Sequence, residues 1–153
     1  MQRRILLGVI GAASPSADGF EMAQQVGREI AGCGAMLLCG GLGGVMEAAA
    51  KGCVEAGGDV LGILPGPDRL KANPYVTIAV PTNMGHARNV IIAHAADALI
   101  AVEGEYGTLS ETAIGLKLGK PVFVLPGAQL IEGVRAVATA EEAVATAIES
   151  VAT

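Results

Sequence analysis

The chain has 153 residues, of which 52% are apolar and only 3% aromatic, and its formal net charge is -5. A chain of this length forms one domain, and its apolar content excludes an intrinsically disordered protein. The acidic balance, without any basic run, predicts no nucleic-acid partner, and no apolar run reaches the ~20 residues of a membrane-spanning helix.

The N-terminal segment, MQRRILLGVIGAASPSA, has two alternative interpretations. Its basic start, short apolar stretch and small residues are typical of a secretory signal peptide. The same apolar run also fits a buried strand, Ile5 to Ala12, that ends in a glycine turn. The strand is favoured, because an alternating strand–helix pattern follows and would lack its first strand without this segment.

Short apolar runs alternate with amphipathic stretches of helical length along the rest of the chain. The apolar runs are continuous, which is typical of strands covered by helices on both faces. This alternation predicts an α/β protein, a single-domain Rossmann-like doubly wound parallel sheet over residues 1–153. After Ile5–Ala12, the expected strands are 35–40, 59–65, 76–81, 97–102 and 121–126, with a short apolar run at 135–138, and the expected helices are 18–31, 43–56, 85–95, 108–118 and 140–151.

The three cysteines, Cys33, Cys39 and Cys53, form no C-x-x-C pair. Their odd number and their spacing argue against a disulfide framework or a zinc site. We therefore expect buried reduced thiols, no metal centre and a cytoplasmic location.

Ligands of doubly wound sheets bind beyond the carboxyl ends of the strands, so the segments that follow the strands form the candidate site. These segments are GAASPS (11–16), GGLGG (40–44), TNMGHAR (82–88) and GEYGT (104–108). Glycine-rich loops allow backbone N–H groups to approach an anion closely. We expect a small phosphorylated ligand to be bound by Gly11, Ser14, Gly40, Gly41, Gly43, Gly44, Met46, Gly104, Tyr106, Gly107 and Thr108.

Each motif also has a purely structural interpretation. The glycines at 40–44 fit a tight strand-to-helix turn that needs positive φ angles. Thr108 and Glu111 have the spacing of a capping box, in which Glu111 only holds the helix end. Arg88 suits phosphate or carboxylate recognition but also fits a solvated surface arginine. His86 and His94 have no third metal ligand near them in sequence, and we interpret both as structural.

These motifs together resemble the LOG-type, lysine-decarboxylase-like Rossmann family. The similar segments are GGLGGVMEAAAKGCVEAGGDVLGILP, NMGHARNVIIAHAADALIAVEGEYGTLSE and GKPVFVL, within residues 5–126. The hallmark of the family is P-G-G-x-G-T-x-x-E with an upstream M-x-x-R-K. Despite the family's label, lysine decarboxylation is not expected, because nothing here resembles a pyridoxal-phosphate lysine site.

The resemblance implies hydrolysis of the N-glycosidic bond of nucleoside 5′-monophosphates, with no cofactor required. It places Gly104, Gly107 and Thr108 in a phosphate-binding loop and makes Arg88 and Glu111 the catalytic pair. A carboxylate can stabilise the oxocarbenium-like cation of glycosidic cleavage or orient the attacking water. The resemblance also implies a homodimer.

The chain departs from the hallmark at two places. Glu103-Gly104-Glu105 replaces Pro-Gly-Gly, and Asn89 replaces the lysine of M-x-x-R-K. A carboxylate near a phosphate is unfavourable, so Glu105 must point away, pair with a cation or mark a different ligand. A shorter branch, the molybdenum-cofactor carrier proteins, is also similar in length and in its G-T-x-S-E-like turn. This branch implies a bound molybdopterin-type ligand, instead of a nucleotide, that is not turned over.

Overall fold

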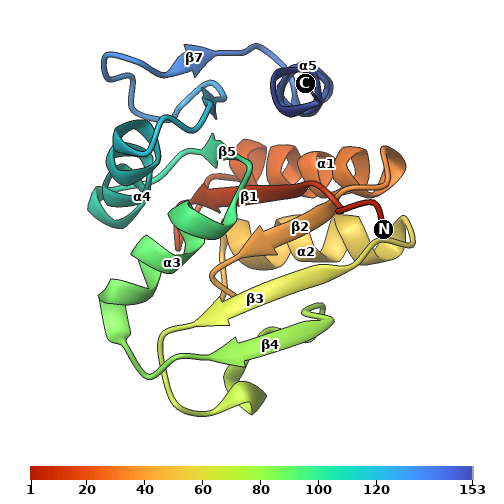
Figure 1. The fold of residues 1–153 in the computed structure, drawn as a ribbon, viewed down its shortest axis with the longest axis vertical. Coiled ribbons are helices and arrows are strands. Elements are labelled where there is room, and N and C mark those ends of the chain that lie inside the picture. Colours follow the sequence, from red (N-terminus) through yellow and green to blue (C-terminus); the bar gives the residue numbers. More distant parts are fainter. Residues whose placement is uncertain (153) are drawn as a thin grey trace.

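A seven-stranded parallel sheet organises residues 1–152, the part of the chain that this computed structural model describes. Its strand order is β4-β3-β2-β1-β5-β6-β7, from bottom to top in Figure 1. The predicted α/β doubly wound parallel sheet is therefore confirmed. The strands are β1 Leu6–Gly11, β2 Met36–Cys39, β3 Val60–Leu64, β4 Ile78–Pro81, β5 Ala98–Val102, β6 Val122–Val124 and β7 Arg135–Ala136.

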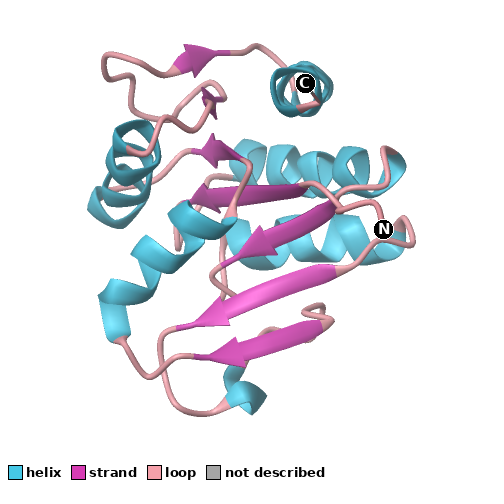
Figure 2. Cartoon of the chain, in the orientation of Figure 1, coloured by secondary structure: helices cyan, strands magenta, loops and turns pink. Residues whose placement is uncertain are grey.

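The helices form one layer on each face of the sheet and are cyan in Figure 2. One apolar core contains residues of α1, α2 and α5, and a second core, on the other face, contains residues of α3 and α4. The helices are α1 Ala17–Gly32, α2 Val45–Glu55, α3 Arg88–Ala95, α4 Tyr106–Lys117 and α5 Ala140–Val151, with short 3-10 turns at Arg69–Lys71 and Gly85–Ala87.

Strand β1 lies in the middle of the sheet. Leu7 pairs with Leu37 of β2 on one side and with Ala98 of β5 on the other. Leu7 and Val9 are fully buried. The strand predicted for the N-terminal segment is therefore confirmed, and its apolar residues serve the core.

The order of the strands reverses between β1 and β5. The chain proceeds outward from β1 through β2 and β3 to β4, and then returns to add β5 on the other side of β1. In open α/β sheets, this switch point leaves a crevice at the carboxyl ends of the two strands. The loops that follow β1 and β5 therefore face each other across the candidate site.

Three helices begin two or more residues away from the expected start, whereas α1 and α5 begin within one residue of it. The 85–95 segment divides into a 3-10 turn and α3, which starts at Arg88. Helix α2 starts at Val45 because Gly44, the residue before it, has a left-handed φ of 69° that no α-helix accommodates. Helix α4 starts at Tyr106, two residues before the expected Thr108, with Glu105 as its N-cap residue.

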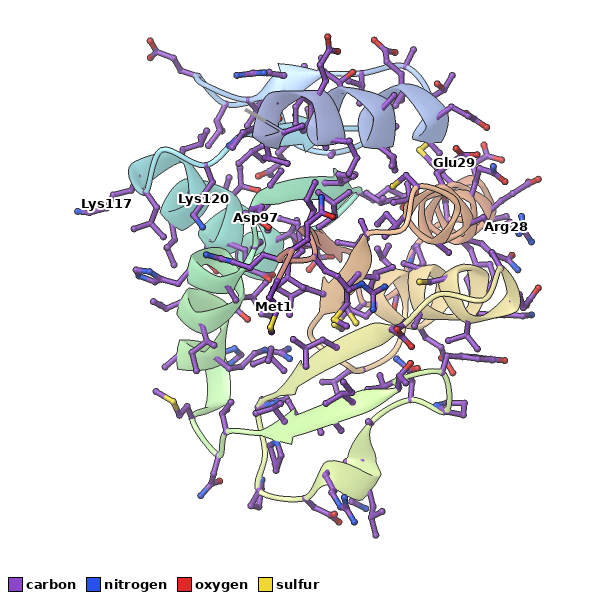
Figure 3. The ribbon with its side chains drawn as sticks, turned by 45° about the vertical axis from the view of Figure 1, so that its right-hand side comes forward. Met1, Arg28, Glu29, Asp97, Lys117 and Lys120 are labelled. Carbon is purple, nitrogen blue, oxygen red and sulfur yellow. The ribbon has the colours of Figure 1, made fainter. Side chains whose placement is uncertain are left out.

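Lys120 forms hydrogen bonds at the C-terminal end of helix α3. Lys120 and Asp97 are both labelled in Figure 3. The Lys120 Nζ donates to the carbonyl oxygens of His94 and Ala96, at 3.0 and 2.5 Å. A cation suits this position, because the last carbonyls of a helix carry partial negative charge. Asp97, just beyond α3, accepts a hydrogen bond from the Leu6 N–H of β1 at 2.8 Å.

The cysteines are free thiols, two of them buried as expected. Burial raises the pKa of Cys39 and of Cys53 to about 11, so both stay protonated. Cys33 is exposed, contrary to the expectation of three buried thiols, because it follows α1 at the surface as its C-cap residue. Within residues 1–152, no helix combines the length and the hydropathy that crossing a membrane requires.

Candidate functional site

A cleft of about 400 Å³ opens at the switch point, beyond the carboxyl end of β1. Its size lies within the range of small-molecule sites. It is bordered by the ends of α2, α3 and α4 where these helices begin. The lining residues are 9–14, Leu42, Met46, His86, Arg88, Asn89, Glu105, Gly107, Thr108 and Glu111.

The structure brings part of the predicted site together. Of the residues expected there, the cleft is lined by Gly11, Ser14, Met46, Arg88, Gly107, Thr108 and Glu111. The others, Gly40, Gly41, Gly43, Gly44, Gly104 and Tyr106, are not among the lining residues. Tyr106 is 86% exposed, and the Gly41 carbonyl accepts a hydrogen bond from the Asn73 N–H at 2.9 Å, away from the cleft.

The glycine loop at 40–44 serves close backbone packing. A Cβ atom on Gly44 would overlap the carbonyl oxygens of Ala12 and Ala13, and its φ of 69° is left-handed. The next residue, Val45, donates its N–H to the Ala12 carbonyl at 3.0 Å. The structural interpretation, a turn that needs positive φ, therefore accounts for Gly44, while Leu42 and Met46 present side chains to the cleft.

Arg88 is a half-buried residue at the first position of α3. Its Nη1 donates to the carbonyl oxygens of Gly40 and Ile63, at 2.5 and 2.6 Å, and its Nε donates to Asn89 Oδ1 at 3.0 Å. Burial lowers the pKa of Arg88, an effect that the nearby Glu111 opposes. A solvated surface arginine is therefore excluded, since the side chain joins α3 to the ends of β2 and β3.

Glu111 lies one turn into α4 and faces the cleft. Burial raises the pKa of its carboxyl group to about 7, although Arg88 acts in the opposite direction. The salt bridges found within residues 1–152, Arg4–Asp59 and Lys51–Glu55, do not involve Glu111. A carboxyl group that is half protonated at neutral pH can both donate and accept a proton.

The capping-box interpretation of Thr108 and Glu111 is wrong. Helix α4 begins at Tyr106, so Thr108 is the third helical residue and not the N-cap. The N-cap residue, Glu105, makes no side-chain capping hydrogen bond. Thr108 is instead buried, with its side chain against the backbone of Gly104.

Asn89 is a buried polar residue whose role sequence reasoning missed. It accepts the Arg88 Nε hydrogen bond and donates from Nδ2 to Ser110 Oγ at 3.4 Å. It thereby connects the start of α3 to the first turns of α4. Its position where the family hallmark has lysine was the one signal in the sequence that marked it.

The two additional carboxylates of the loop before α4 have different surroundings. Glu105 is exposed at the rim of the cleft. Glu103 points to the N-terminus of α1, where its carboxylate accepts hydrogen bonds from the Ser16 N–H at 2.9 Å and the Ser16 hydroxyl at 2.6 Å. These hydrogen bonds lower the pKa of Glu103. Of these two carboxylates, only Glu105 lines the cleft.

Comparison with known proteins identifies the family to which this chain belongs. The model of the SLOG cluster4 family matches residues 4–152. The chain belongs to the SLOG cluster4 family. An uncharacterized protein of Archaeoglobus fulgidus is 51% identical over 144 residues, which are 94% of this chain and 95% of that protein.

Solved structures with the same fold include two proteins that bind or carry molybdenum cofactor. The molybdenum cofactor binding protein of the phototrophic bacterium Rippkaea orientalis has a TM-score of 0.93 and 33% identity, over 100% of both chains. The molybdenum cofactor carrier protein of Chlamydomonas reinhardtii has a TM-score of 0.90 and 35% identity, over 99% of this chain and 100% of that one. This SLOG cluster4 protein is thus similar over its whole length to molybdenum-cofactor carrier proteins, the short branch that its sequence resembles.

Proposed function

We propose that this protein binds a small phosphorylated heterocycle in the switch-point cleft and holds it without turning it over, as a carrier or sensor. The ligand class is a molybdopterin-type compound or a nucleotide, and the protein requires no other cofactor. The observation that carries the proposal is the cleft itself. It combines room for a heterocycle, about 400 Å³, with the N-terminal turn of α4.

The phosphate is expected at the first turn of α4. The first N–H groups of a helix have no intrahelical acceptor, and the helix dipole favours an anion there. No side chain caps this end of α4, and Gly107 lines the cleft without a side chain to block it. Glu105 is exposed at the rim, where a carboxylate 4 Å from a phosphate costs about 1 kcal/mol in water. The phosphate therefore lies on the Gly107 side, away from Glu105.

Binding without turnover is supported by the contacts of Arg88. Its Nη1 donates to the carbonyls of Gly40 and Ile63 and its Nε to Asn89, so most of its donors serve the fold. A catalytic arginine must instead meet the substrate as charge develops. The similarity to two proteins that bind or carry molybdenum cofactor supports the same conclusion.

A second candidate function, nucleoside 5′-monophosphate phosphoribohydrolase, is favoured by Glu111. Its carboxyl group faces the cleft with a pKa raised to about 7, suitable for a general acid or base. Its carboxylate form could stabilise the oxocarbenium-like cation that forms when a glycosidic bond breaks. Under this function, Glu111 is the catalytic residue, and Arg88 fixes the position of the backbone segments around Glu111 through its hydrogen bonds.

Thermal-shift measurements with nucleoside monophosphates and phosphorylated pterins, followed by chromatography of each mixture, distinguish the two functions. A ligand at 100 times its dissociation constant adds about 2.7 kcal/mol to the free energy of unfolding, which is a readily measured shift. The carrier function predicts stabilisation with the ligand recovered intact. Release of free base, abolished in Glu111→Gln, would establish the hydrolase instead. No stabilisation by any member of the two ligand classes would refute both.

A further inference from the structure

A carboxylate from the β5–α4 loop occupies the N-terminus of α1. Glu103 Oε1 accepts a hydrogen bond from the Ser16 N–H at 2.9 Å, and its Oε2 accepts one from the Ser16 hydroxyl at 2.6 Å. The Ser16 Oγ in turn accepts the Gly19 N–H at 3.0 Å as the N-cap of α1. The loop after β5 is therefore joined to the first turn of α1, from a position 87 residues away in the sequence.

Two local features accommodate this contact. Glu103 has a left-handed backbone with φ of 56°, which residues other than glycine rarely adopt. Gly19 lies beneath the carboxylate, where a Cβ atom would overlap the Glu103 carboxylate oxygens. The left-handed backbone of Glu103 and the missing side chain of Gly19 together allow the Glu103 carboxylate to reach the N-terminus of α1.

The same loop leads directly into the ligand cleft. Gly104 packs so closely on Thr108 that a Cβ atom on Gly104 would overlap the Thr108 side chain. Glu105 is the N-cap of α4, and its carbonyl accepts the Leu109 N–H at 2.9 Å. Gly107 and Thr108 then line the cleft. Because Gly104 connects Glu103 to α4, a displacement of Glu103 would also displace the first turn of α4, where we expect the phosphate to bind.

We propose that Glu103 is a positioning residue that fixes the β5–α4 loop, and with it the first turn of α4, in the conformation that binds the phosphate. The part of this inference that concerns the ligand rests on the proposed function. Glu103 replaces the proline of the P-G-G hallmark. A proline ring would fix φ at about −65°, so the left-handed φ of Glu103 gives this loop a different backbone, which two hydrogen bonds to another element hold in place.

Glu103→Gly is the most informative variant, because glycine suits the left-handed φ and the protein therefore stays folded. It removes both hydrogen bonds to Ser16, and we expect amide hydrogen exchange at Leu109–Glu111, the first hydrogen-bonded amides of α4, to become about tenfold faster in the ligand-free protein. Glu103→Gln keeps the length of the side chain and one acceptor, and we expect it to restore slow exchange in part. The affinity for a nucleoside monophosphate or a phosphorylated pterin falls about tenfold in Glu103→Gly, because the donors are no longer pre-ordered.

Glu142→Ala is the matched control. The Glu142 carboxylate also accepts a backbone N–H beside a helix N-cap, from Ala138 at 2.8 Å next to Thr139 of α5. Its loss removes a comparable contact far from the loop before α4, so exchange at Leu109–Glu111 and ligand affinity should both stay unchanged.

The outcomes separate this inference from the proposed function. Unchanged exchange at Leu109–Glu111 in Glu103→Gly would overturn the positioning role. Faster exchange with unchanged affinity would also overturn it and leave Glu103 as a structural contact. If the wild-type protein binds neither probe, the proposed function fails, and the exchange rates still decide whether Glu103 fixes the loop.

Discussion

Arg88 donates a hydrogen bond from Nη1 to the carbonyl oxygen of Gly40 at 2.5 Å, and so joins the start of α3 to the end of β2. The same Nη1 donates to Ile63 at the end of β3. One guanidinium group therefore holds three elements together at the edge of the ligand cleft. Glu111 lies close enough for the two charges to influence each other's pKa.

Arg88→Ala should lower the free energy of unfolding by about 2–4 kcal/mol. The substitution leaves two backbone carbonyls without their donor, and hydrogen bonds from a charged group are stronger than neutral ones. Urea denaturation measures the change. The exposed Arg69 provides the control, and Arg69→Ala should change stability by less than about 0.5 kcal/mol. Equal effects of the two substitutions would mean that the Arg88 contacts contribute nothing to the fold.

The stability of the protein should depend on the ionisation of Glu111. Burial raises its pKa from 4.5 to about 7, so the folded protein binds this proton more tightly than the unfolded chain. The resulting stabilisation is complete below pH 4.5 and is lost as the pH rises through 7, at up to about 1.4 kcal/mol per pH unit. Glu111→Gln should remove this dependence, so the difference in stability between variant and wild type should grow from pH 4.5 to pH 7. If urea denaturation gives the same difference in unfolding free energy between Glu111→Gln and wild type at every pH in this range, the prediction is wrong.

Gly107→Ala should raise stability and weaken ligand binding. Gly107 lies within α4, and no atom lies within 4 Å of a Cβ placed on it, so alanine gains up to about 0.5–1 kcal/mol of helix propensity. The added methyl group enters the cleft where the phosphate is expected, and we predict a loss of affinity of about tenfold. Gly32→Ala, at an equally open position in α1, should add stability alone. Thermal unfolding and ligand titration measure the two effects, and an unchanged affinity in Gly107→Ala would place the phosphate elsewhere.

We expect the protein to form a homodimer through the exposed apolar face of β4. Ile78 and Val80 are 49% and 40% exposed, and their register with Leu61 and Ile63 of β3 places the four side chains on one face of the sheet. Exposed apolar patches of this kind are typical of association surfaces. Light scattering at micromolar concentration should give twice the mass of the chain, and Ile78→Lys should give the monomer. Leu70→Lys, at an exposed apolar residue outside the sheet, is the control. A monomeric wild-type protein would refute the expectation.

The order of strands and helices could be predicted because the buried strands are continuous apolar runs, most of them next to a glycine or a proline. Such runs indicate where the strands end, and the ends of parallel strands determine which loops meet. This is why Ser14, Met46 and Thr108, which follow three different strands, were expected at one site and line one cleft. The helix starts at 45 and 106 differed from expectation because they depend on caps and on close backbone contacts.

The direction of each charged side chain could not be predicted from sequence. Arg88 follows a glycine- and histidine-containing turn in the sequence, yet its partners are the carbonyls of Gly40 and Ile63, which lie 48 and 25 residues earlier. Glu103 and Glu105 are two residues apart in one loop, but one binds Ser16 and the other is exposed at the rim of the cleft. Contacts of this kind depend on tertiary structure, which leaves no periodic signal in the chain.

The central position of β1 also bears on how the chain folds during its synthesis. Leu7 and its partner Ala98 on β5 lie about ninety residues apart. At about 5–20 residues per second, the ribosome releases β5 some 5–20 seconds after β1. During that interval, β1 can pair with β2 on one side, while its other edge offers unpaired N–H and C=O groups to any extended chain nearby. The nascent protein is therefore most vulnerable to intermolecular pairing at the strand that becomes its most protected one.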